Sequence, residues 1–235
     1  MPDPRPIAVF DSGIGSLSVV SALRQELPQE SIIYLADRAR YPYGTKGRDQ
    51  LRSIIIQTLK FLEGYGPKSI IVASITPSML VLREARLHTT VPVFGVYPAL
   101  SDAVALSKTK HIALMATKGM IESIELDKFT KPYITTARIV AINASPIIDT
   151  VESGRFLEDG GVRETIARTM KGAKSDPKID VAILGSTHLP LVRDRIAELF
   201  PKMQFVNPAL DTVKQVRTYL HQHDMEAEGK GSMKI

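Results

Sequence analysis

The sequence predicts an α/β protein of two similar, doubly wound parallel-sheet lobes, with the site in the cleft between them. Short apolar runs alternate with segments of helical spacing along the chain of 235 residues, which is typical of parallel α/β layers. Two of these runs also end alike. Residues 70–78 read Ile-Ile-Val-Ala-Ser-Ile-Thr-Pro-Ser, and residues 181–190 read Val-Ala-Ile-Leu-Gly-Ser-Thr-His-Leu-Pro. Buried parallel strands that deliver small polar side chains to the start of a helix have this pattern.

The first half of the chain alternates predicted strands and helices. Strands are expected at residues 7–10, 31–36, 70–73 and 91–96, and helices at about 17–27, 51–62 and 77–88. Pro77 suits the first position of its helix, because that position needs no backbone N–H. Right-handed crossovers bring the carboxyl ends of the strands to one edge of the sheet. We therefore expect Asp11, Tyr43 and Ser74 to lie along that edge.

The second half repeats the scheme. Strands are expected at residues 111–116, 138–142, 181–184 and 204–206, and helices at about 98–107, 146–153, 162–174, 189–200 and 208–221. We expect residues 1–97 and 207–224 to form the first lobe and residues 98–206 to form the second. Residues 225–235 are low in apolar content, so a disordered tail is expected there.

The composition is that of a globular protein with a basic surface, since 30 Lys and Arg stand against 25 Asp and Glu. These charges are scattered, which favours a solvated surface over a nucleic-acid partner. Without cysteine the chain has no disulfide, no thiolate metal site and no thiol nucleophile. No apolar run approaches the ~18 residues of a membrane span, and the N-terminus does not resemble a signal peptide. We expect a cytoplasmic protein without a membrane partner.

Motifs for nucleotide and metal binding are missing from the sequence. Gly13-Ile14-Gly15 lacks the third glycine and the acidic partner of a dinucleotide fingerprint, and no P-loop occurs. No pair of histidines has the spacing of metal ligands. Neither NAD binding nor a metal site is expected.

Several motifs, in order along nearly the whole chain, resemble those of the glutamate racemase family, within the wider aspartate/glutamate racemase group. They are Asp11-Ser12-Gly13-Ile14-Gly15, Tyr41-Pro42-Tyr43-Gly44, Val72-Ala73-x-x-Thr76-x-Ser78, Ala116-Thr117-x-Gly119, Val151-Glu152-x-Gly154 and Gly185-x-Thr187-His188-x-Pro190-Leu191. The resemblance implies cofactor-independent interconversion of L- and D-glutamate, or of a related acidic amino acid, and with it a supply of D-glutamate as a peptidoglycan precursor. It implies a small dicarboxylic amino acid or related acid as the ligand, and it is compatible with a homodimer.

Racemisation removes the α-proton from one face of the substrate and returns a proton to the other face. Without a cofactor, this needs two acid/base groups on opposite sides of the carbon. By the resemblance these groups stand at Ser74 and Ser186, while Asp11, His188 and Glu152 assist proton transfer. The residues implied to contact the ligand are Ser12, Tyr43, Gly44, Ile75, Thr76, Thr117 and Thr187.

The sequence departs from the family at both proton-transfer positions, because the family has cysteine where this chain has Ser74 and Ser186. A thiol has an ordinary pKa of about 8.5, so a useful fraction is ionised near neutral pH. A serine hydroxyl is far less acidic and works only beside a strong base, for which Asp11 and His188 are the candidates. Ile75 also replaces an asparagine that binds substrate in the family. The resemblance therefore implies a racemase of impaired activity.

Two other functions stay open: a non-catalytic ligand-binding or interaction protein on a racemase scaffold, and a sister reaction of the superfamily on another small acid. Single residues also have plainer interpretations. Asp11, Ser74 and Thr76 stand where helix caps are common, and His188 could be a structural histidine. The serines could reflect engineered Cys→Ser replacement or natural divergence, and engineering does not account for Ile75.

Overall fold

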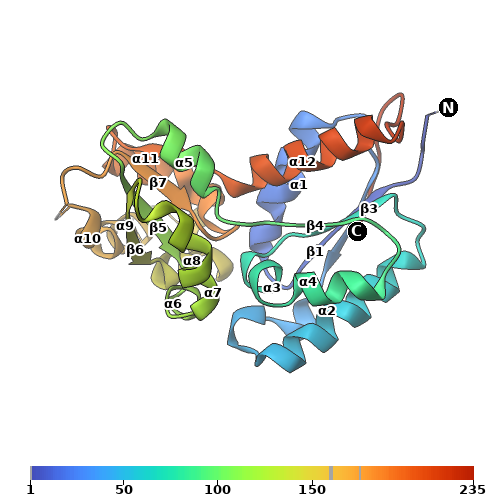
Figure 1. The fold of residues 1–235 in the computed structure, drawn as a ribbon, viewed down its shortest axis with the longest axis horizontal. Helices are drawn as coiled ribbons and strands as arrows, with labels where there is room; N and C mark the ends of the chain where they lie inside the picture. The colour runs from blue at the N-terminus through green and yellow to red at the C-terminus, as the bar shows by residue number, and fades with distance from the viewer. Residues whose placement is uncertain (1, 159–160, 175) are drawn as a thin grey trace. The chain divides into compact units, whose positions relative to one another are not determined.

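The structure is a computed structural model that describes residues 2–158, 161–174 and 176–235. The chain divides into two compact units (Figure 1): the residues up to Tyr97 together with Ala209–Ile235, and Pro98–Pro208. Each unit contains a parallel sheet of its own. The predicted fold class of two parallel-sheet α/β lobes is confirmed.

The sheet of the first unit has five strands in the order β4-β3-β1-β2-β9, and neighbouring strands pair in parallel. The strands are β1 (Ile7–Asp11), β2 (Ile32–Ala36), β3 (Ser69–Val72), β4 (Val93–Gly95) and β9 (Met233–Lys234). β1 and β3 are buried along their whole length, as expected of a parallel sheet covered on both faces. This is why the sequence of these strands is an apolar run and not an alternating one.

Helices cover both faces of this first sheet. They are α1 (Leu17–Glu26), α2 (Arg48–Glu63), α3 (Ile75–Leu80), α4 (Leu82–Ala85) and α12 (Pro208–Gln222), with short 3-10 turns η1 (Ile14–Ser16), η2 (Arg38–Arg40), η3 (Tyr43–Thr45) and η4 (Arg86–His88). Figure 1 shows α1 and α12 on one face and α2, α3 and α4 on the other. α2 buries Leu51, Ile55 and Leu59 at the spacing of one helix face.

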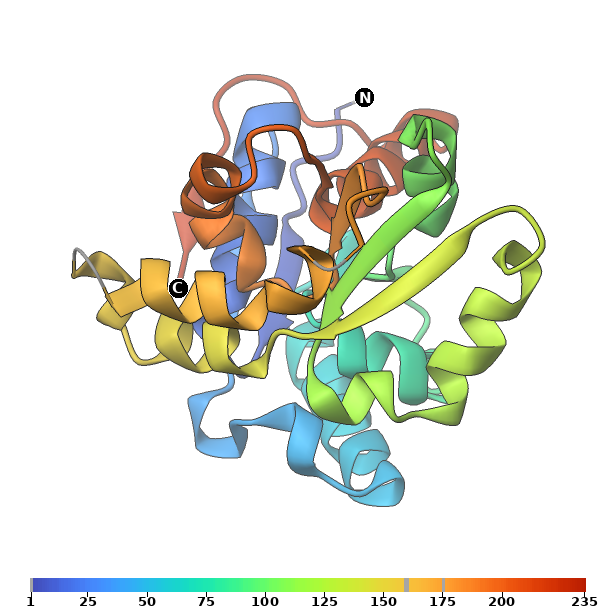
Figure 2. The ribbon, with the colours of Figure 1, turned by 90° about the vertical axis from the view of Figure 1, so that its left-hand side faces the viewer.

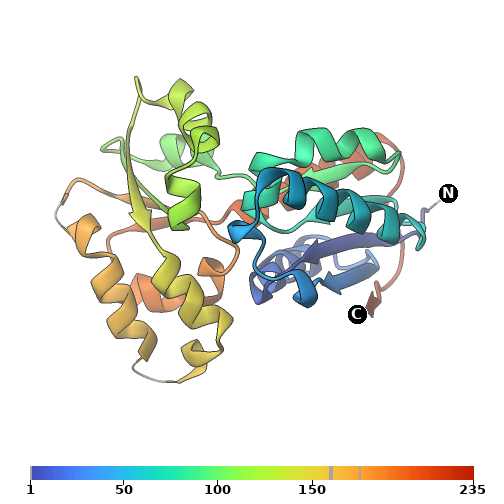
Figure 3. The same ribbon diagram turned by 90° about the horizontal axis from the view of Figure 1, so that it is seen from below.

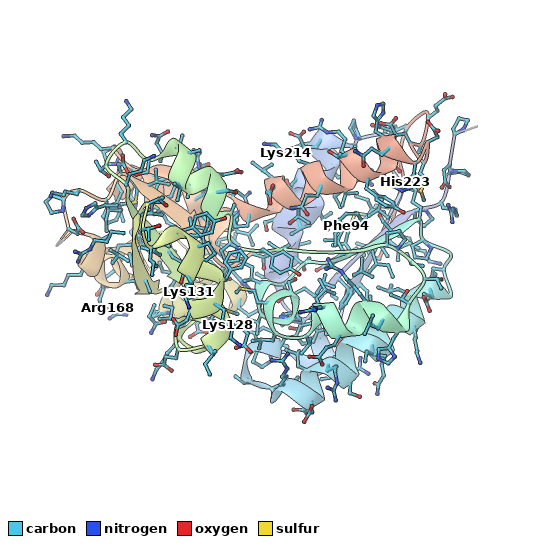
Figure 4. All side chains as sticks on the ribbon, in the orientation of Figure 1. Phe94, Lys128, Lys131, Arg168, Lys214 and His223 are labelled. Atoms are coloured by element: carbon cyan, nitrogen blue, oxygen red, sulfur yellow. The ribbon has the colours of Figure 1, made fainter. Side chains whose placement is uncertain are left out.

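Aromatic rings attach α12 to β4, the strand at one edge of the first sheet. The ring of Phe94 meets that of Tyr219 edge-on at 5.6 Å, and Tyr219 stacks on His223 at 4.0 Å. Figure 4 labels Phe94 and His223, which mark the two ends of this row of rings. Aromatic pairs of this geometry add to the stabilisation that burial provides. The C-terminal helix thereby completes the first unit.

The helix predicted at 77–88 is divided and begins earlier than expected. Ser74 occupies the N-cap position and α3 starts at Ile75, so the prediction that Pro77 is the first helical residue is wrong. Pro77 is still tolerated, because the first turn of a helix leaves its backbone N–H groups without intrahelical partners. Val81, with φ −135° and ψ −11°, then separates α3 from α4.

The second unit is built on four strands in the order β6-β5-β7-β8, again paired in parallel. The strands are β5 (His111–Ala116), β6 (Arg138–Asn143), β7 (Val181–Leu184) and β8 (Gln204–Val206). Figure 2 shows β5 and β6, in green and yellow, running side by side. β7 is buried at every position, and its end supplies the stretch at 185–188.

Short helices surround the second sheet. They are α5 (Leu100–Leu106), α6 (Lys118–Ile121), α7 (Ile124–Thr130), α8 (Ser145–Glu152), α9 (Gly161–Thr169), α10 (Lys171–Lys174) and α11 (Arg193–Leu199), with 3-10 turns η5 (Lys131–Tyr133), η6 (Arg155–Leu157) and η7 (Leu189–Val192). Figure 3 shows α8 and α9 packed side by side. The helix predicted at 162–174 is divided at Met170, and the one predicted at 189–200 opens with η7. Within the described ranges, no helix combines the length and apolar content that crossing a membrane requires.

The C-terminal segment 225–235 differs from the expectation of a disordered tail, because it supplies β9 beside β2. A buried ion pair holds its start, where Lys68 Nζ lies 2.6 Å from Glu30 Oε2 and both side chains have no exposed surface. Lys68 also donates to the carbonyl of Met225 at 2.6 Å, and Glu30 accepts from the Ala227 backbone N–H at 2.9 Å. Buried charges need such partners, and here the backbone of the tail provides them.

Removing one member of this pair should destabilise the protein strongly. Lys68→Ala leaves the Glu30 carboxylate buried without its counter-charge, which typically costs about 3–5 kcal/mol of unfolding free energy. Chemical denaturation measures the change. Lys60→Ala on α2 is the matched control, since Lys60 is exposed and should change stability by less than about 0.5 kcal/mol. Equal stability of the two variants would contradict the assigned role of the pair.

Asp180 fixes the turn that leads into β5. Its Oδ1 accepts from Ser107 Oγ at 2.5 Å, and its Oδ2 accepts from the backbone N–H groups of Lys108 at 2.8 Å and Thr109 at 3.1 Å. Burial acts to raise the pKa of Asp180, but these hydrogen bonds outweigh it, so the pKa lies below its ordinary value. The ionised form therefore stabilises the folded state.

Asp180→Asn should lower stability at neutral pH by about 1–2 kcal/mol, because the neutral amide has one acceptor oxygen where the carboxylate has two, so either Ser107 or the two backbone N–H groups lose their acceptor. Since the folded-state pKa is lowered, the stabilisation is present above the ordinary value of 3.8 and is lost as pH falls through the folded-state value. Denaturation curves of wild type and variant should thus converge on acidification. Asp149→Asn, on the exposed side of α8, is the control. A stability gap that is constant with pH would rule out the ionised carboxylate as its source.

Candidate active site

Three polar side chains form a hydrogen-bonded chain in the second unit. Ser186 Oγ lies 3.3 Å from His188 Nδ1, and His188 Nε2 lies 2.7 Å from Glu152 Oε2. The side chains of His188 and Glu152 are only 9% and 8% exposed. The three residues of the second unit to which the resemblance assigns proton transfer, Ser186, His188 and Glu152, are therefore in direct contact.

The chain of hydrogen bonds requires one tautomer of the imidazole. A carboxylate can only accept, so His188 Nε2 carries the hydrogen that it donates to Glu152. In the neutral ring Nδ1 is then an acceptor, and Ser186 Oγ donates its hydroxyl hydrogen to it. The arrangement can take a proton from the hydroxyl side, and Glu152 lies where it stabilises the imidazolium that forms.

The local fold explains why these residues meet. A Cβ atom at Gly185 would lie 2.6 Å from the carbonyl oxygen of Met115 on β5, a distance that no side chain tolerates. Glycine is therefore required where β7 ends, and the chain turns directly after it into η7. Glu152 is the last residue of α8, which packs against η7.

The other predicted residues of this unit are placed differently. Thr117 is half-buried, and its Oγ1 accepts from the Met120 backbone N–H at 3.3 Å as the N-cap of α6. Its hydroxyl thus has a structural role, beyond the ligand contact that the resemblance implies. Thr187, which stands between Ser186 and His188 in the sequence, is buried in the structure.

In the first unit, Asp11 is the last residue of β1, and Ser74 lies just after the neighbouring strand β3. The Ala73 backbone N–H donates to the Phe10 carbonyl at 2.8 Å, so the next residues, Asp11 and Ser74, stand at adjacent strand ends. Asp11 and Ser12 are buried, while Ser74 is half-buried. Although Ser74 holds the N-cap position of α3, its side chain makes no capping hydrogen bond within the described chain. The capping interpretation of Ser74 is thereby weakened.

The Tyr43 ring is buried in the core and its hydroxyl donates to Asp37 Oδ2 at 2.8 Å, so the ligand contact that the resemblance implies would fall to the Tyr43 backbone. Burial raises the pKa of Tyr43, and the hydrogen bond to Asp37 and the charges of Asp37 and Asp11 raise it further. The neutral hydroxyl is thus committed to Asp37. Gly44 is exposed, and a Cβ atom there would lie 3.9 Å from Thr76 Oγ1, which places these two predicted residues next to each other. Ile75 is buried.

Sequence reasoning missed a charged cluster at the end of β2. Asp37 is buried and forms an ion pair with Arg40, whose Nη1 lies 3.2 Å from Oδ2. Arg38 Nη1 donates to the carbonyl of Ser12 at 3.1 Å, and its guanidinium lies 5.1 Å from the Tyr41 ring centroid. An acid and a base three residues apart, directly after a strand, are the signal that could have revealed this cluster. It brings positive charge to the residues that follow β1.

The chemistry available in each unit is proton transfer. In the second unit the Ser186 hydroxyl is hydrogen-bonded to the His188 imidazole, which is hydrogen-bonded to the Glu152 carboxylate. In the first unit Ser74 and Asp11 stand at the ends of adjacent strands. Among the residues that the structure describes, no group of three or more His, Asp or Glu side chains is arranged to hold a metal ion.

Known proteins resemble this chain over most of its length. A model of the Asp/Glu/Hydantoin racemase family matches residues 15–216. A glutamate racemase of Bacillus cereus is 32% identical over 228 residues, covering 96% of this chain and 84% of that protein.

Solved structures show the same similarity. The crystal structure of a glutamate racemase isoform from Bacillus anthracis gives a TM-score of 0.86 at 26% identity, covering 97% of this chain and 86% of the other. The structure of a glutamate racemase from Francisella tularensis, in complex with D-glutamate, gives 0.82 at 28% identity, covering 99% and 87%.

Filling the space at Gly185 should disrupt the site and the unit that carries it. Gly185→Ala puts a Cβ atom against the backbone of Met115. A flexible side chain could move away from such a clash, but the backbone of a neighbouring strand cannot. Overpacking of this kind typically costs about 1–3 kcal/mol, measurable by thermal denaturation. Gly172→Ala is the control, because an added Cβ there meets open space among the described residues. If Gly185→Ala melts like Gly172→Ala, the close approach does not constrain the site.

Proposed function

The chain belongs to the Asp/Glu/Hydantoin racemase family, and on this premise we propose that it interconverts L- and D-glutamate, or a related acidic amino acid, without a cofactor. The observation that carries the proposal is the buried hydrogen-bonded chain of Ser186, His188 and Glu152. It supplies a hydroxyl at the end of β7 with a partner that can take its proton. The similarity to glutamate racemases over nearly the whole chain selects the substrate class.

In the proposed reaction, the second unit acts on one face of the α-carbon. The α-proton passes to Ser186 Oγ while the hydroxyl proton passes to His188 Nδ1, so the serine ends neutral and the histidine ends as imidazolium. Glu152, which accepts the Nε2 hydrogen, stabilises that positive charge. In the opposite direction the same groups return a proton to the carbon.

The first unit acts on the other face in this proposal. In this direction the proposal requires Asp11, at the end of the neighbouring strand, in its acid form: Ser74 delivers its hydroxyl proton to the carbanion and takes the proton of Asp11, which ends as a carboxylate. Two-base racemisation needs one acid/base group for each face of the α-carbon, and the proposal assigns Ser186 to one face and Ser74 to the other.

Carboxylate groups of the substrate need hydrogen-bond donors and positive charge. The proposal assigns the donors to Ser12 and Thr76 of the first unit and to Thr187 of the second. Arg38 supports it with positive charge, since its guanidinium contacts the carbonyl of Ser12. Tyr43 takes part only through its backbone, because its hydroxyl is bonded to Asp37.

Exchange of the α-proton in deuterated water tests the proposal directly. Wild type incubated with L- or D-glutamate should lose the α-proton signal in NMR and form the other enantiomer, seen by chiral chromatography. Ser186→Ala should slow exchange by at least about 100-fold, the usual contribution of a positioned acid/base group. Replacing Ser74 and Ser186 together by cysteine should raise the rate, because a thiol ionises far more readily.

Ser101→Ala is the matched control, since Ser101 is an exposed serine on α5 of the same unit. Its exchange rate should equal that of wild type. If neither wild type nor the double cysteine variant exchanges the α-proton of glutamate or aspartate at high protein concentration, the chain is not a racemase of acidic amino acids. A non-catalytic binding protein or a sister reaction would then take its place.

Location and assembly belong to the same proposal. We place the reaction in the cytoplasm and take a homodimer as the working assembly. Neither choice enters the chemistry above.

A further inference from the structure

We propose that Ser186 is also an activated nucleophile, which takes an acyl group from small carboxylic esters and passes it to water. This esterase activity goes beyond racemisation, because it forms a covalent bond to Ser186 Oγ. It needs only the second unit. The geometry that points to it is the serine–histidine–carboxylate sequence of hydrogen bonds, with the serine and the carboxylate on different ring nitrogens.

The two ring nitrogens of His188 have different partners, and this distinguishes it from a structural histidine. His111 in the same unit also pairs with a carboxylate, but there Nδ1 itself faces Asp176 Oδ2 at 3.0 Å. In His188 the carboxylate holds Nε2, which leaves the Nδ1 lone pair directed at the Ser186 hydroxyl. A nucleophilic serine requires a base held in this way by a third group.

A helix-cap role does not account for the arrangement. Ser186 Oγ does accept from the His188 backbone N–H, at 3.4 Å, which is long for a hydrogen bond. That contact uses an oxygen lone pair and leaves the hydroxyl hydrogen for Nδ1. A helix-cap role of Ser186 also does not explain why the Glu152 side chain is buried, since burial of a carboxylate is unfavourable unless it is paired. Pairing with His188 orients the ring toward the serine.

Two other hydroxyl groups of the unit, those of Thr117 and Ser123, are engaged as helix caps. Thr117 Oγ1 accepts from Met120, and Ser123 Oγ accepts from the Leu126 N–H while donating to the Met120 carbonyl. Each of these bonds is to backbone. Ser186 donates to an imidazole instead, which can remove the proton as the oxygen attacks.

The acyl transfer balances without any further reactant than ester and water. Ser186 Oγ bonds to the carbonyl carbon as its proton moves to His188 Nδ1. The ester C–O bond then breaks, and the alcohol leaves with that proton. A water molecule attacks the acyl-serine and gives a proton to His188, and collapse of this second intermediate returns the proton to Ser186 Oγ and frees the acid. Because Ser186 is only 8% exposed, a small acyl group such as acetyl is the expected substrate.

Covalent labelling of the full-length chain tests the inference. A small fluorophosphonate should modify Ser186, with the serine oxygen bonding to phosphorus as fluoride leaves, and peptide mass spectrometry should locate the adduct. p-Nitrophenyl acetate should be hydrolysed with release of p-nitrophenolate. Ser186→Ala should abolish both, and His188→Gln should slow both by at least about 100-fold. His111→Gln, which alters the other histidine–carboxylate pair, should match wild type.

A second measurement covers the case in which Ser186→Ala fails to fold. The chain contains no cysteine, so Ser186→Cys introduces the only thiol. Iodoacetamide should alkylate it at least about tenfold faster than the exposed thiol of Ser101→Cys, and Glu152→Gln added to Ser186→Cys should remove the difference. The inference is overturned if wild type is labelled no faster than denatured protein, or if Ser186→Cys reacts no faster than Ser101→Cys. Labelling without α-proton exchange would refute only the proposed racemase, and exchange without labelling would refute only the nucleophile.

Discussion

Parallel pairing of neighbouring strands positions the polar residues of both units, because it brings the strand ends to one edge of each sheet. In the first unit the bond from Ala73 to Phe10 leaves Asp11 and Ser74 as the next residues on adjacent strands. In the second unit β7 lies so close to β5 that only glycine fits at 185. A register shift of one residue would turn these side chains to the other face of the sheet. The proton-transfer groups therefore depend on the packing of apolar strands.

The sequence was sufficient for the features that repeat along the chain. Apolar runs predicted the central strands because both faces of a parallel sheet are buried, and the repeated ending predicted polar residues after β3 and β7. The contact of Ser186 with His188 was within reach as well, since they are two residues apart. Glu152 was the weaker case, because its approach to His188 depends on how α8 packs on η7.

Features that depend on tertiary contacts could not be predicted from the sequence. The tail at 225–235 looked disordered because it is polar, yet its backbone groups are what Lys68 and Glu30 need in the core. The resemblance implies Tyr43 as a ligand contact, but it gave no sign that the Tyr43 hydroxyl is directed at Asp37. Lys68 and Glu30 find these partners in a distant part of the chain, about which local pattern carries no information. Tyr43 and Asp37 are only six residues apart, but their contact depends on how the loop after β2 folds back.

The two serines are not equivalent, and this asymmetry bears on what the chain can catalyse. Ser186 lies beside an imidazole nitrogen that can accept its proton, and the carboxylate on the other ring nitrogen can stabilise the resulting charge. Ser74 has beside it a strand end that carries Asp11. Proton abstraction by a hydroxyl needs a base on the far side of the oxygen, as does nucleophilic attack by that oxygen. The same proton path thus serves both reactions at Ser186. What the oxygen does is then decided by the substrate: an α-proton within reach is transferred, and a carbonyl carbon within reach is attacked.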